Sequence, residues 1–177
     1  KSGCAEEKPV AAAALPARSI YQLEGKFTDD AGRPVELATR RGQPVVLSMF
    51  FASCEYACPV IVDDMKRVRA ALPVDVREKT RFVLVSFDVA RDTTAALHAY
   101  RERMNLDGAW TLLRGETAEV QNLAMLLGVK FKQDARGQFS HSNLITVLNP
   151  EGEVAHQRAG LLGDVSEAAK AVALVAK

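Results

Sequence analysis

Two long apolar runs of strand length dominate the hydrophobic pattern of the chain. Residues 44–51 read Pro-Val-Val-Leu-Ser-Met-Phe-Phe, and residues 81–87 read Arg-Phe-Val-Leu-Val-Ser-Phe. Continuous runs of this kind are typical of central strands that are buried on both faces of a sheet. A helix is expected after the first run, because Pro59 suits the first turn of a helix. Apolar side chains then recur at helical spacing, at Ile61, Met65, Val68 and Leu72.

Weaker patterns add further helices and strands. Residues 93–104 and 116–127 place apolar side chains at helical spacing, and residues 110–113 between them form a short apolar run typical of a strand. A last helix is expected near the C-terminus, where Asp164 and Glu167 stand as a variant of the capping box. These patterns predict strands and helices that alternate along the chain.

Two β-hairpins are expected to frame this alternation. Residues 21–27 and 33–37 flank a turn-rich segment that ends at Gly32. Residues 143–148 and 153–155 flank an Asn-Pro-Glu-Gly turn. The hairpins would therefore open and close the folded part.

The predicted order of elements indicates an α/β fold. Alternating strands and helices favour a sheet with parallel strands and helices on both faces, and a closing antiparallel hairpin completes the thioredoxin-like plan. We expect a single thioredoxin-like domain with an N-terminal β-hairpin over residues 19–177. Residues 1–18 are expected to be a flexible tail or a lipoprotein linker, because four consecutive alanines there lack an amphipathic period and are soon followed by Pro16.

An isolated cysteine lies in this tail. The segment Ser-Gly-Cys-Ala at positions 2–5 resembles the end of a bacterial lipoprotein signal, although Lys1 stands where that pattern usually has leucine. We expect Cys4 to carry lipid and to tether the domain to a membrane. The expected location is the bacterial periplasm, at the periplasmic face of the inner membrane. The alternative is an incidental free cysteine.

Composition and charge narrow the function classes. The chain has 177 residues, of which 48% are hydrophobic, enough to build a core. Its 23 basic and 22 acidic residues leave a net charge of +1, so composition gives no reason to expect a nucleic-acid partner. No apolar run approaches the roughly 18 residues that a membrane span needs.

The other two cysteines, Cys54 and Cys58, follow the first long strand and lie where the helix is expected to begin. The partial positive charge of a helix N-terminus favours a thiolate over a thiol. Side chains four residues apart on a helix face the same way, with Cβ atoms about 5–6 Å apart. The pair could therefore hold a soft metal ion or form a disulfide. Two cysteines that only pack in the core are the remaining alternative.

His141 is the histidine best placed to join this pair. It lies in an expected loop directly before the apolar run Leu-Ile-Thr-Val-Leu, and in a thioredoxin-like fold that loop returns close to the junction of the first strand and helix. It could then complete a site of two sulfurs and one nitrogen, although an ordinary surface histidine is also compatible with the pattern. We interpret His98 and His156 as solvated or structural.

Three blocks of sequence resemble the Sco/SenC family of copper proteins. Residues 50–59 are similar to the family's Cys-x-x-x-Cys-Pro, residues 85–93 to its Ser-x-Asp-Pro-x-Arg-Asp-Thr, and residues 141–152 to its histidine, strand and Asp-Pro-x-Gly turn. The resemblance extends from about residue 21 to the C-terminus. Departures from the family pattern are Glu55, Val89 and Ser140, none of which removes a candidate ligand.

The resemblance implies a role for each motif residue. Cys54, Cys58 and His141 would bind one copper ion, Cu(I) or Cu(II), and Asp88 would lie close by as an outer or weak axial group. Arg91 and Asp92 would fix the intervening loop by pairing with each other. The family resemblance also implies delivery of copper to cytochrome oxidase or another cuproenzyme, so the expected partner is a cuproenzyme subunit or a second copper chaperone.

The sequence therefore favours a copper metallochaperone, which is a carrier rather than a turnover enzyme. The main alternative is a thiol-disulfide reductase, in which Cys54 and Cys58 would be the catalytic redox pair acting on a client's cysteines. A peroxidase of the peroxiredoxin type fits poorly, because residues 47–53 lack the expected lead to a peroxidatic cysteine. An interaction domain with a vestigial site fits poorly too, since the ligand set is intact.

Overall fold

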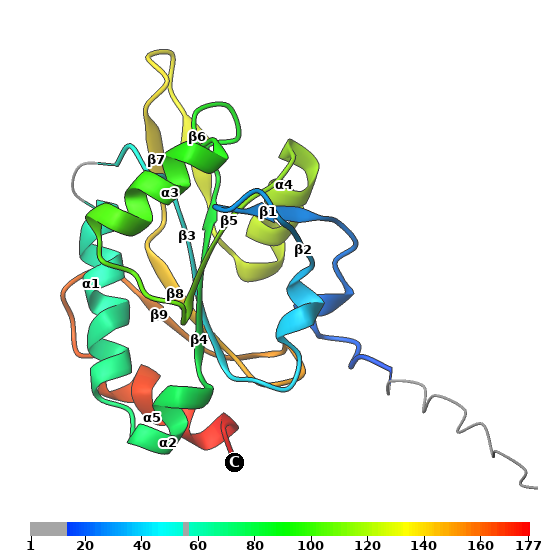
Figure 1. The fold of residues 1–177 in the computed structure, drawn as a ribbon, viewed down its shortest axis with the longest axis vertical. Helices are drawn as coiled ribbons and strands as arrows, with labels where there is room; N and C mark the ends of the chain where they lie inside the picture. Colours follow the sequence, from blue (N-terminus) through cyan, green and yellow to red (C-terminus); the bar gives the residue numbers. More distant parts are fainter. Residues whose placement is uncertain (1–13, 55–56) are drawn as a thin grey trace, which may run out of the picture.

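A seven-stranded sheet forms the centre of the computed structural model, which describes residues 14–54 and 57–177 (Figure 1). The strand order is β2-β1-β5-β4-β3-β8-β9, with β3, β4 and β5 parallel and the remaining pairings antiparallel. The strands of this sheet are β1 (Phe27–Asp29), β2 (Pro34–Val35), β3 (Val45–Phe50), β4 (Arg81–Ser86), β5 (Trp110–Arg114), β8 (Leu144–Leu148) and β9 (Val154–Ala159).

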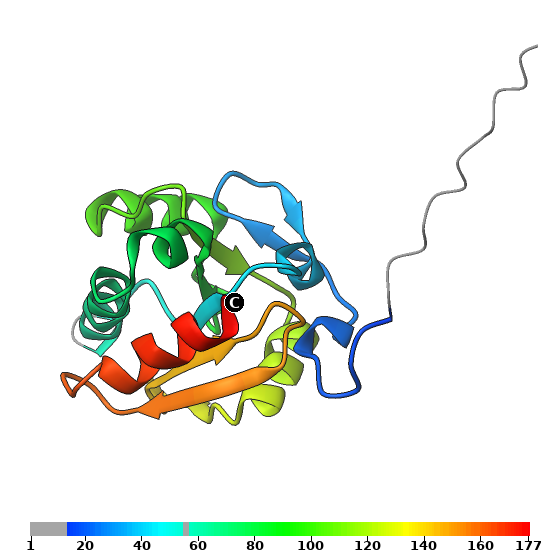
Figure 2. The ribbon, with the colours of Figure 1, turned by 90° about the horizontal axis from the view of Figure 1, so that it is seen from below.

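Helices cover both faces of this sheet. The α-helices are α1 (Ala57–Ala70), α2 (Val74–Lys79), α3 (Thr94–Arg103), α4 (Thr117–Leu127) and α5 (Ser166–Val175), and the 3-10 helices are η1 (Ile20–Gln22) and η2 (Leu37–Arg40). Right-handed crossovers place α1 and α3 on the same face, where α5 also packs, and α4 lies on the other face (Figure 2). The architecture confirms the predicted α/β, thioredoxin-like fold with an N-terminal β-hairpin.

The two long apolar runs form β3 and β4, as predicted. Every residue of β3 is buried, and only Arg81 of β4 is partly exposed. Their parallel register pairs Phe50 with Ser86, so the carboxyl ends of both strands lie side by side. The loop that contains Cys54 and the loop that contains Asp88 therefore leave the sheet at the same edge, where open α/β sheets place their functional sites.

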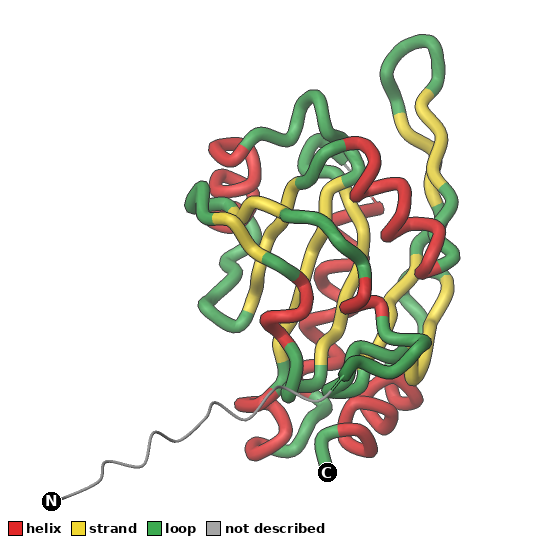
Figure 3. Tube along the Cα trace, turned by 90° about the vertical axis from the view of Figure 1, so that its right-hand side faces the viewer, coloured by secondary structure: helices red, strands yellow, loops and turns green. Residues whose placement is uncertain are grey.

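A second, two-stranded sheet projects from this edge. It consists of β6 (Phe131–Gln133) and β7 (Phe139–His141), paired antiparallel. Figure 3 shows this hairpin extending beyond the body of the protein. The sequence interpretation placed His141 in a loop, and the structure corrects this, because His141 is the last residue of β7. The strands were missed because each has only three residues.

The opening hairpin differs in extent from the prediction. Its strands are only β1 and β2. Tyr21 belongs to η1 instead, where the backbone N–H of Tyr21 donates a hydrogen bond to the Ser19 hydroxyl. Helix α2 was also missed, because it has only six residues between its N-cap and its C-cap.

The interpretation of the last helix also needs correction. Val165 is the N-cap of α5, and it makes no side-chain capping bond. The Asp164 carboxylate instead accepts hydrogen bonds from the N–H and hydroxyl of Ser166. Because Asp164 binds Ser166, two residues later in the chain, it forms no capping box with Glu167.

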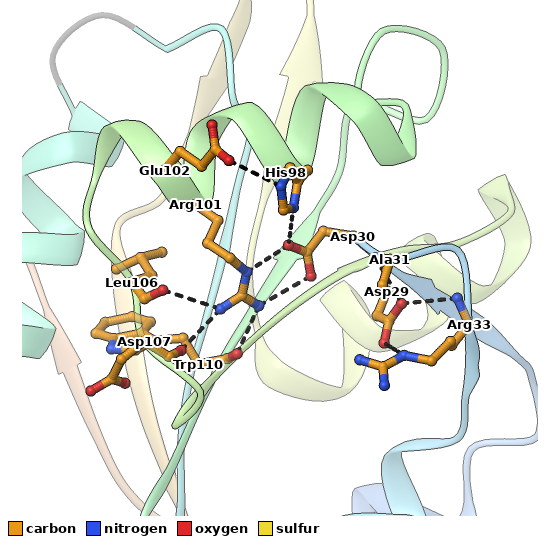
Figure 4. Close-up of polar contacts among 10 residues, drawn as sticks. All are labelled: Asp29, Asp30, Ala31, Arg33, His98, Arg101, Glu102, Leu106, Asp107 and Trp110. Carbon is orange, nitrogen blue, oxygen red and sulfur yellow. Dashed lines mark hydrogen bonds and ion pairs between the residues drawn. The ribbon is translucent and has the colours of Figure 1, made fainter.

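Arg101 fastens α3 to the sheet edge opposite β9 (Figure 4). Its guanidinium binds both carboxylate oxygens of Asp30, at 2.5 and 3.1 Å, and donates to the carbonyls of Leu106, Asp107 and Trp110. His98 also contacts Asp30, at 3.3 Å, which agrees with the structural interpretation of this histidine. The network joins α3 to the β1–β2 turn and to the start of β5.

Cys4 and most of the expected tail, residues 1–13, lie outside the described residues. Within residues 14–54 and 57–177, no helix has the length and hydrophobicity that a membrane crossing requires.

Candidate metal centre

The candidate ligands come from two separate segments. Cys54 lies in the loop between β3 and α1, Cys58 lies in the first turn of α1, and His141 ends β7 of the projecting hairpin. Cys58 is fully buried, whereas Cys54 and His141 are partly exposed. The centre therefore has one sealed side and one side open to solvent.

The three ligand atoms converge. The two sulfurs and a ring nitrogen of His141 all lie within 4.8 Å of one another, and Cys58 Sγ lies 4.0 Å from His141 Nε2. Both cysteines are free thiols. Metal–sulfur and metal–nitrogen bonds are about 2.0–2.3 Å long, so closure of about 1 Å at most would bring all three atoms onto one ion. Asp88 is not a member of this group within the described residues.

Local hydrogen bonds orient two of the three ligands. The backbone N–H of Cys58 donates to Cys54 Sγ at 3.3 Å, which orients that sulfur. Nδ1 of His141 lies 3.2 Å from the carbonyl oxygen of Ser142. Because a carbonyl can only accept, Nδ1 carries the proton and Nε2 presents its lone pair toward Cys58. The histidine is thus held in the tautomer that suits a metal ligand.

Burial dominates the acidity of Cys58. It raises the pKa of the Cys58 thiol well above its ordinary value. A hydrogen bond with the backbone of Phe51 acts to lower this pKa, whereas the nearby Cys54 acts to raise it further. The expected effect of the helix N-terminus is therefore outweighed at this residue. A cation bound at the sulfur supplies the missing stabilisation, because a coordinating thiol loses its proton outright.

Aromatic rings hold the hairpin against the body. The His141 ring packs at 5.0 Å from Phe87 and edge-on at 5.7 Å from Phe51. Phe131 and Phe139, one from each strand of the hairpin, pack on Phe87 at 5.1 Å. We call these four phenylalanines and the histidine the aromatic cluster. It fixes the position of His141 through packing between the hairpin and the ends of β3 and β4.

Asp92 fixes the loop that leads to Cys54. Its carboxylate accepts hydrogen bonds from the Ala52 N–H at 2.8 Å and from the Ser86 hydroxyl at 2.6 Å. Burial raises the pKa of Asp92 even though these two hydrogen bonds act to lower it. Arg103, the last residue of α3, donates a hydrogen bond of 3.1 Å to the carbonyl oxygen of Ala52. Both backbone polar groups of Ala52 are therefore held two residues before Cys54.

The expected pairing of Arg91 with Asp92 is wrong. Arg91 binds the Asp88 carboxylate at 2.6 Å, and the same guanidinium donates to the carbonyl of Gly137 at 2.6 Å and lies over the Phe139 ring. Gly137 is in the turn between β6 and β7. Asp88, buried and paired, therefore acts on the hairpin of His141 through Arg91.

The structure brings together the three residues proposed as ligands and leaves His98 and His156 elsewhere, on α3 and β9. Sequence reasoning missed the aromatic cluster and the hairpin that it holds. The alternation of Phe131, Gln133, Phe139 and His141 around a turn ending in Gly137 was the available signal.

Comparisons with known proteins agree with this geometry. The family model described as SCO1/SenC matches residues 16–176. A protein of Stutzerimonas stutzeri named "Putative copper-binding protein" is 31% identical over 149 residues, which span 81% of this chain and 71% of that protein.

Two solved structures share the fold. The structure of Bradyrhizobium japonicum ScoI with copper bound is similar with a TM-score of 0.68 and 22% identity, covering 85% of this chain and 96% of that chain. The second structure is that of BsSco, in which a disulfide switch is described. BsSco is a member of the Sco family of cytochrome c oxidase assembly proteins, and its structure is similar with a TM-score of 0.73 and 19% identity. That similarity covers 87% of this chain and 92% of BsSco.

Proposed function

The chain belongs to the SCO1/SenC family, and on that premise we propose that it is a copper metallochaperone. It would bind one copper ion through Cys54, Cys58 and His141 and deliver it to the copper centre of a respiratory oxidase or a related cuproenzyme. The observation that carries the proposal is the convergence of two thiols and one imidazole nitrogen within 4.8 Å. Two soft sulfurs select Cu(I), and an imidazole suits either copper oxidation state.

Partial exposure of the centre supports a carrier function. Copper is the cargo in this proposal, so it must leave the protein as readily as it arrives. Cys58 is sealed in the core, whereas Cys54 and His141 can be reached from solvent. A cysteine or histidine of the acceptor can therefore replace His141 or Cys54 first, while Cys58 still holds the ion. Such stepwise exchange moves copper to the acceptor without releasing the free ion into water.

Export to the bacterial periplasm, with lipid on Cys4, belongs to the same proposal. A tethered carrier would meet membrane-bound oxidases by diffusion in two dimensions. The similarity to a lipoprotein signal at positions 2–5 supports this location. The periplasm is oxidising, so a reductant must keep Cys54 and Cys58 open for Cu(I).

A transfer experiment separates the carrier from the reductase. The acceptor is a soluble oxidase fragment with a binuclear copper centre, prepared free of copper, once with reduced and once with oxidised cysteines. We expect the Cu(I)-loaded protein to fill the reduced fragment, and the Ser53→Ala variant to do the same, because Ser53 is exposed and contributes no ligand. Reduction of the oxidised fragment by the copper-free protein, without copper transfer from the loaded one, would favour the reductase.

Arg91→Ala should weaken copper binding although Arg91 is not a ligand. The substitution removes the links from the hairpin turn to Asp88 and over Phe139, so His141 is held less firmly. Loss of partners that orient a metal ligand typically costs about 10–100-fold in affinity. Competition with a chromophoric Cu(I) chelator measures the change. Arg91→Lys keeps the charge but not the planar fork, so an intermediate affinity is expected. Equal affinity in all three proteins would show that the link to the hairpin is irrelevant to binding.

A further inference from the structure

The projecting hairpin has two different faces. In the register of β6 and β7, Phe131 pairs with His141 and Gln133 with Phe139, and the aromatic members of these pairs pack toward the body. The residues between them alternate to the other face, where Lys132 pairs with Ser140. We call the exposed residues Lys130, Lys132, Ser140 and Ser142 the lysine face.

The lysine face adjoins the candidate ligand His141. A shallow depression of about 310 Å³ is lined by Lys130, Phe131, Lys132, Ser140, His141 and Ser142. Two lysines and the candidate ligand His141 therefore line one surface depression. Two hydrogen bonds between Lys130 and Ser142, each 2.9 Å long, join the two strands at the base of the hairpin, beside the depression.

The positive charge of this surface is not neutralised within the described residues. No carboxylate there lies within salt-bridge distance of Lys130 or Lys132, in contrast to Arg91, which is paired with Asp88. Asp134 is the hairpin's own acidic residue, and its carboxylate accepts hydrogen bonds from the N–H groups of Arg136 and Gln138. With three basic residues and one acidic residue, the hairpin over positions 130–141 carries +2 in a chain whose net charge is +1.

We infer that the lysine face docks an acidic segment of the protein that receives copper. This inference rests on the proposed function and adds to it the charge of the partner. Carboxylates on the acceptor would pair with Lys130 and Lys132 and bring its copper-binding side chains beside His141. Charge complementarity of this kind raises the rate of encounter more than the strength of the final complex. The expected signature is therefore a transfer rate that depends on acceptor charge and on salt.

A different role for the two lysines must be separated from docking. Cu(I) held by two thiolates carries a net negative charge, and nearby ammonium groups could stabilise that charge within the protein itself. In that case, removing the lysines would weaken copper binding. In the docking case, copper affinity is unchanged and only the transfer rate falls.

The test uses two synthetic acceptor peptides with the same pair of cysteines, one flanked by aspartates and one flanked by lysines. Transfer from the Cu(I)-loaded protein is followed by stopped flow, without oxygen. At about 20 mM salt we expect the acidic peptide to accept copper about tenfold faster than the basic one, and at about 0.5 M salt we expect nearly equal rates, because salt screens exposed charges.

Charge-reversed variants locate the effect. Lys130→Glu with Lys132→Glu should abolish or reverse the preference and leave copper affinity within about threefold of the original. The matched control is Lys26→Glu with Lys79→Glu, which makes the same change in net charge at two exposed lysines. Lys79 ends α2, at the opposite end of the protein from β6 and β7 (Figure 1). The control should keep the preference.

Three results would overturn the inference. Equal rates for both peptides at low salt would show that the surface does not select acidic partners. An equal effect of both double variants would assign the preference to net charge, and a fall in copper affinity that matches the fall in rate would assign the lysines to the centre itself. If the original protein retains no copper, the proposed function fails as well, and that outcome is seen before any acceptor is added.

Discussion

Serine in place of Cys58 is expected to lower Cu(I) affinity by about a thousandfold or more, since a hydroxyl is a poor ligand for a soft ion and this loss corresponds to about 4 kcal/mol. Cys58 is fully buried in the first turn of α1, so no ligand from the solvent can take its place. Serine is close to cysteine in size, and the thermal unfolding of the variant should show that the fold is kept. Anaerobic competition with a chromophoric chelator measures the affinity.

A third cysteine offers a matched control for this experiment. Cys4 lies in the N-terminal segment outside the described residues and is not one of the proposed ligands. Cys4→Ser makes the same chemical change and should leave the affinity unaltered. Unchanged affinity in Cys58→Ser, or an equal loss in Cys4→Ser, would contradict the assignment of Cys58 as a ligand.

Arg101→Leu is expected to destabilise the folded protein by about 3–5 kcal/mol, because it removes the guanidinium that is paired with a buried carboxylate. Asp30 is 8% exposed and receives two hydrogen bonds from Arg101. Three backbone carbonyls lose the same donor (Figure 4). Urea unfolding gives the free energy of unfolding for both proteins.

The comparison variant is Arg33→Leu, in the same figure. Arg33 pairs with Asp29, but its side chain is 76% exposed, so we expect a loss below about 1 kcal/mol. Asp29 also keeps two backbone N–H donors, from Ala31 and from residue 33 itself. Similar losses in both variants would contradict the view that burial of Asp30 makes the Arg101 network important.

Acidification provides a second readout for Arg101→Leu. Burial acts to raise the pKa of Asp30, but hydrogen bonds and charge from Arg101 outweigh it and hold the pKa below its ordinary value. A group whose pKa is lowered by folding adds stability above its unfolded pKa, about 3.9 for aspartate, and loses it as the pH falls through the folded value. The difference in stability between the original protein and the variant should therefore narrow below about pH 4.

The sequence was sufficient for the elements that bury most of their side chains. β3 and β4 are buried almost throughout, so their apolar runs could be recognised without any knowledge of neighbours. The position of Cys54 and Cys58 at the strand–helix junction followed from the same pattern. The three-residue strands β6 and β7 were missed, because their stability comes from the aromatic cluster, which is assembled from rings far apart in the sequence.

Side-chain direction explains the wrong pairing of Arg91 and Asp92. The two residues are adjacent in the sequence and opposite in charge, and the family resemblance implied that they pair. In the structure, Asp92 points to the Ala52 N–H, and Arg91 points to Asp88 and the hairpin turn. Adjacent side chains in a loop commonly diverge, and only the backbone path decides which groups each one meets. The ligand set itself, by contrast, depended on resemblance and on the fold.

X-ray absorption at the copper edge tests the central claim most directly. The reduced protein is loaded with one equivalent of Cu(I), and the same measurement is made on His141→Ala. The proposed centre predicts two sulfur ligands and one imidazole nitrogen, with the nitrogen lost in the variant. A spectrum that is the same with and without His141, or a protein that retains no copper, would contradict it.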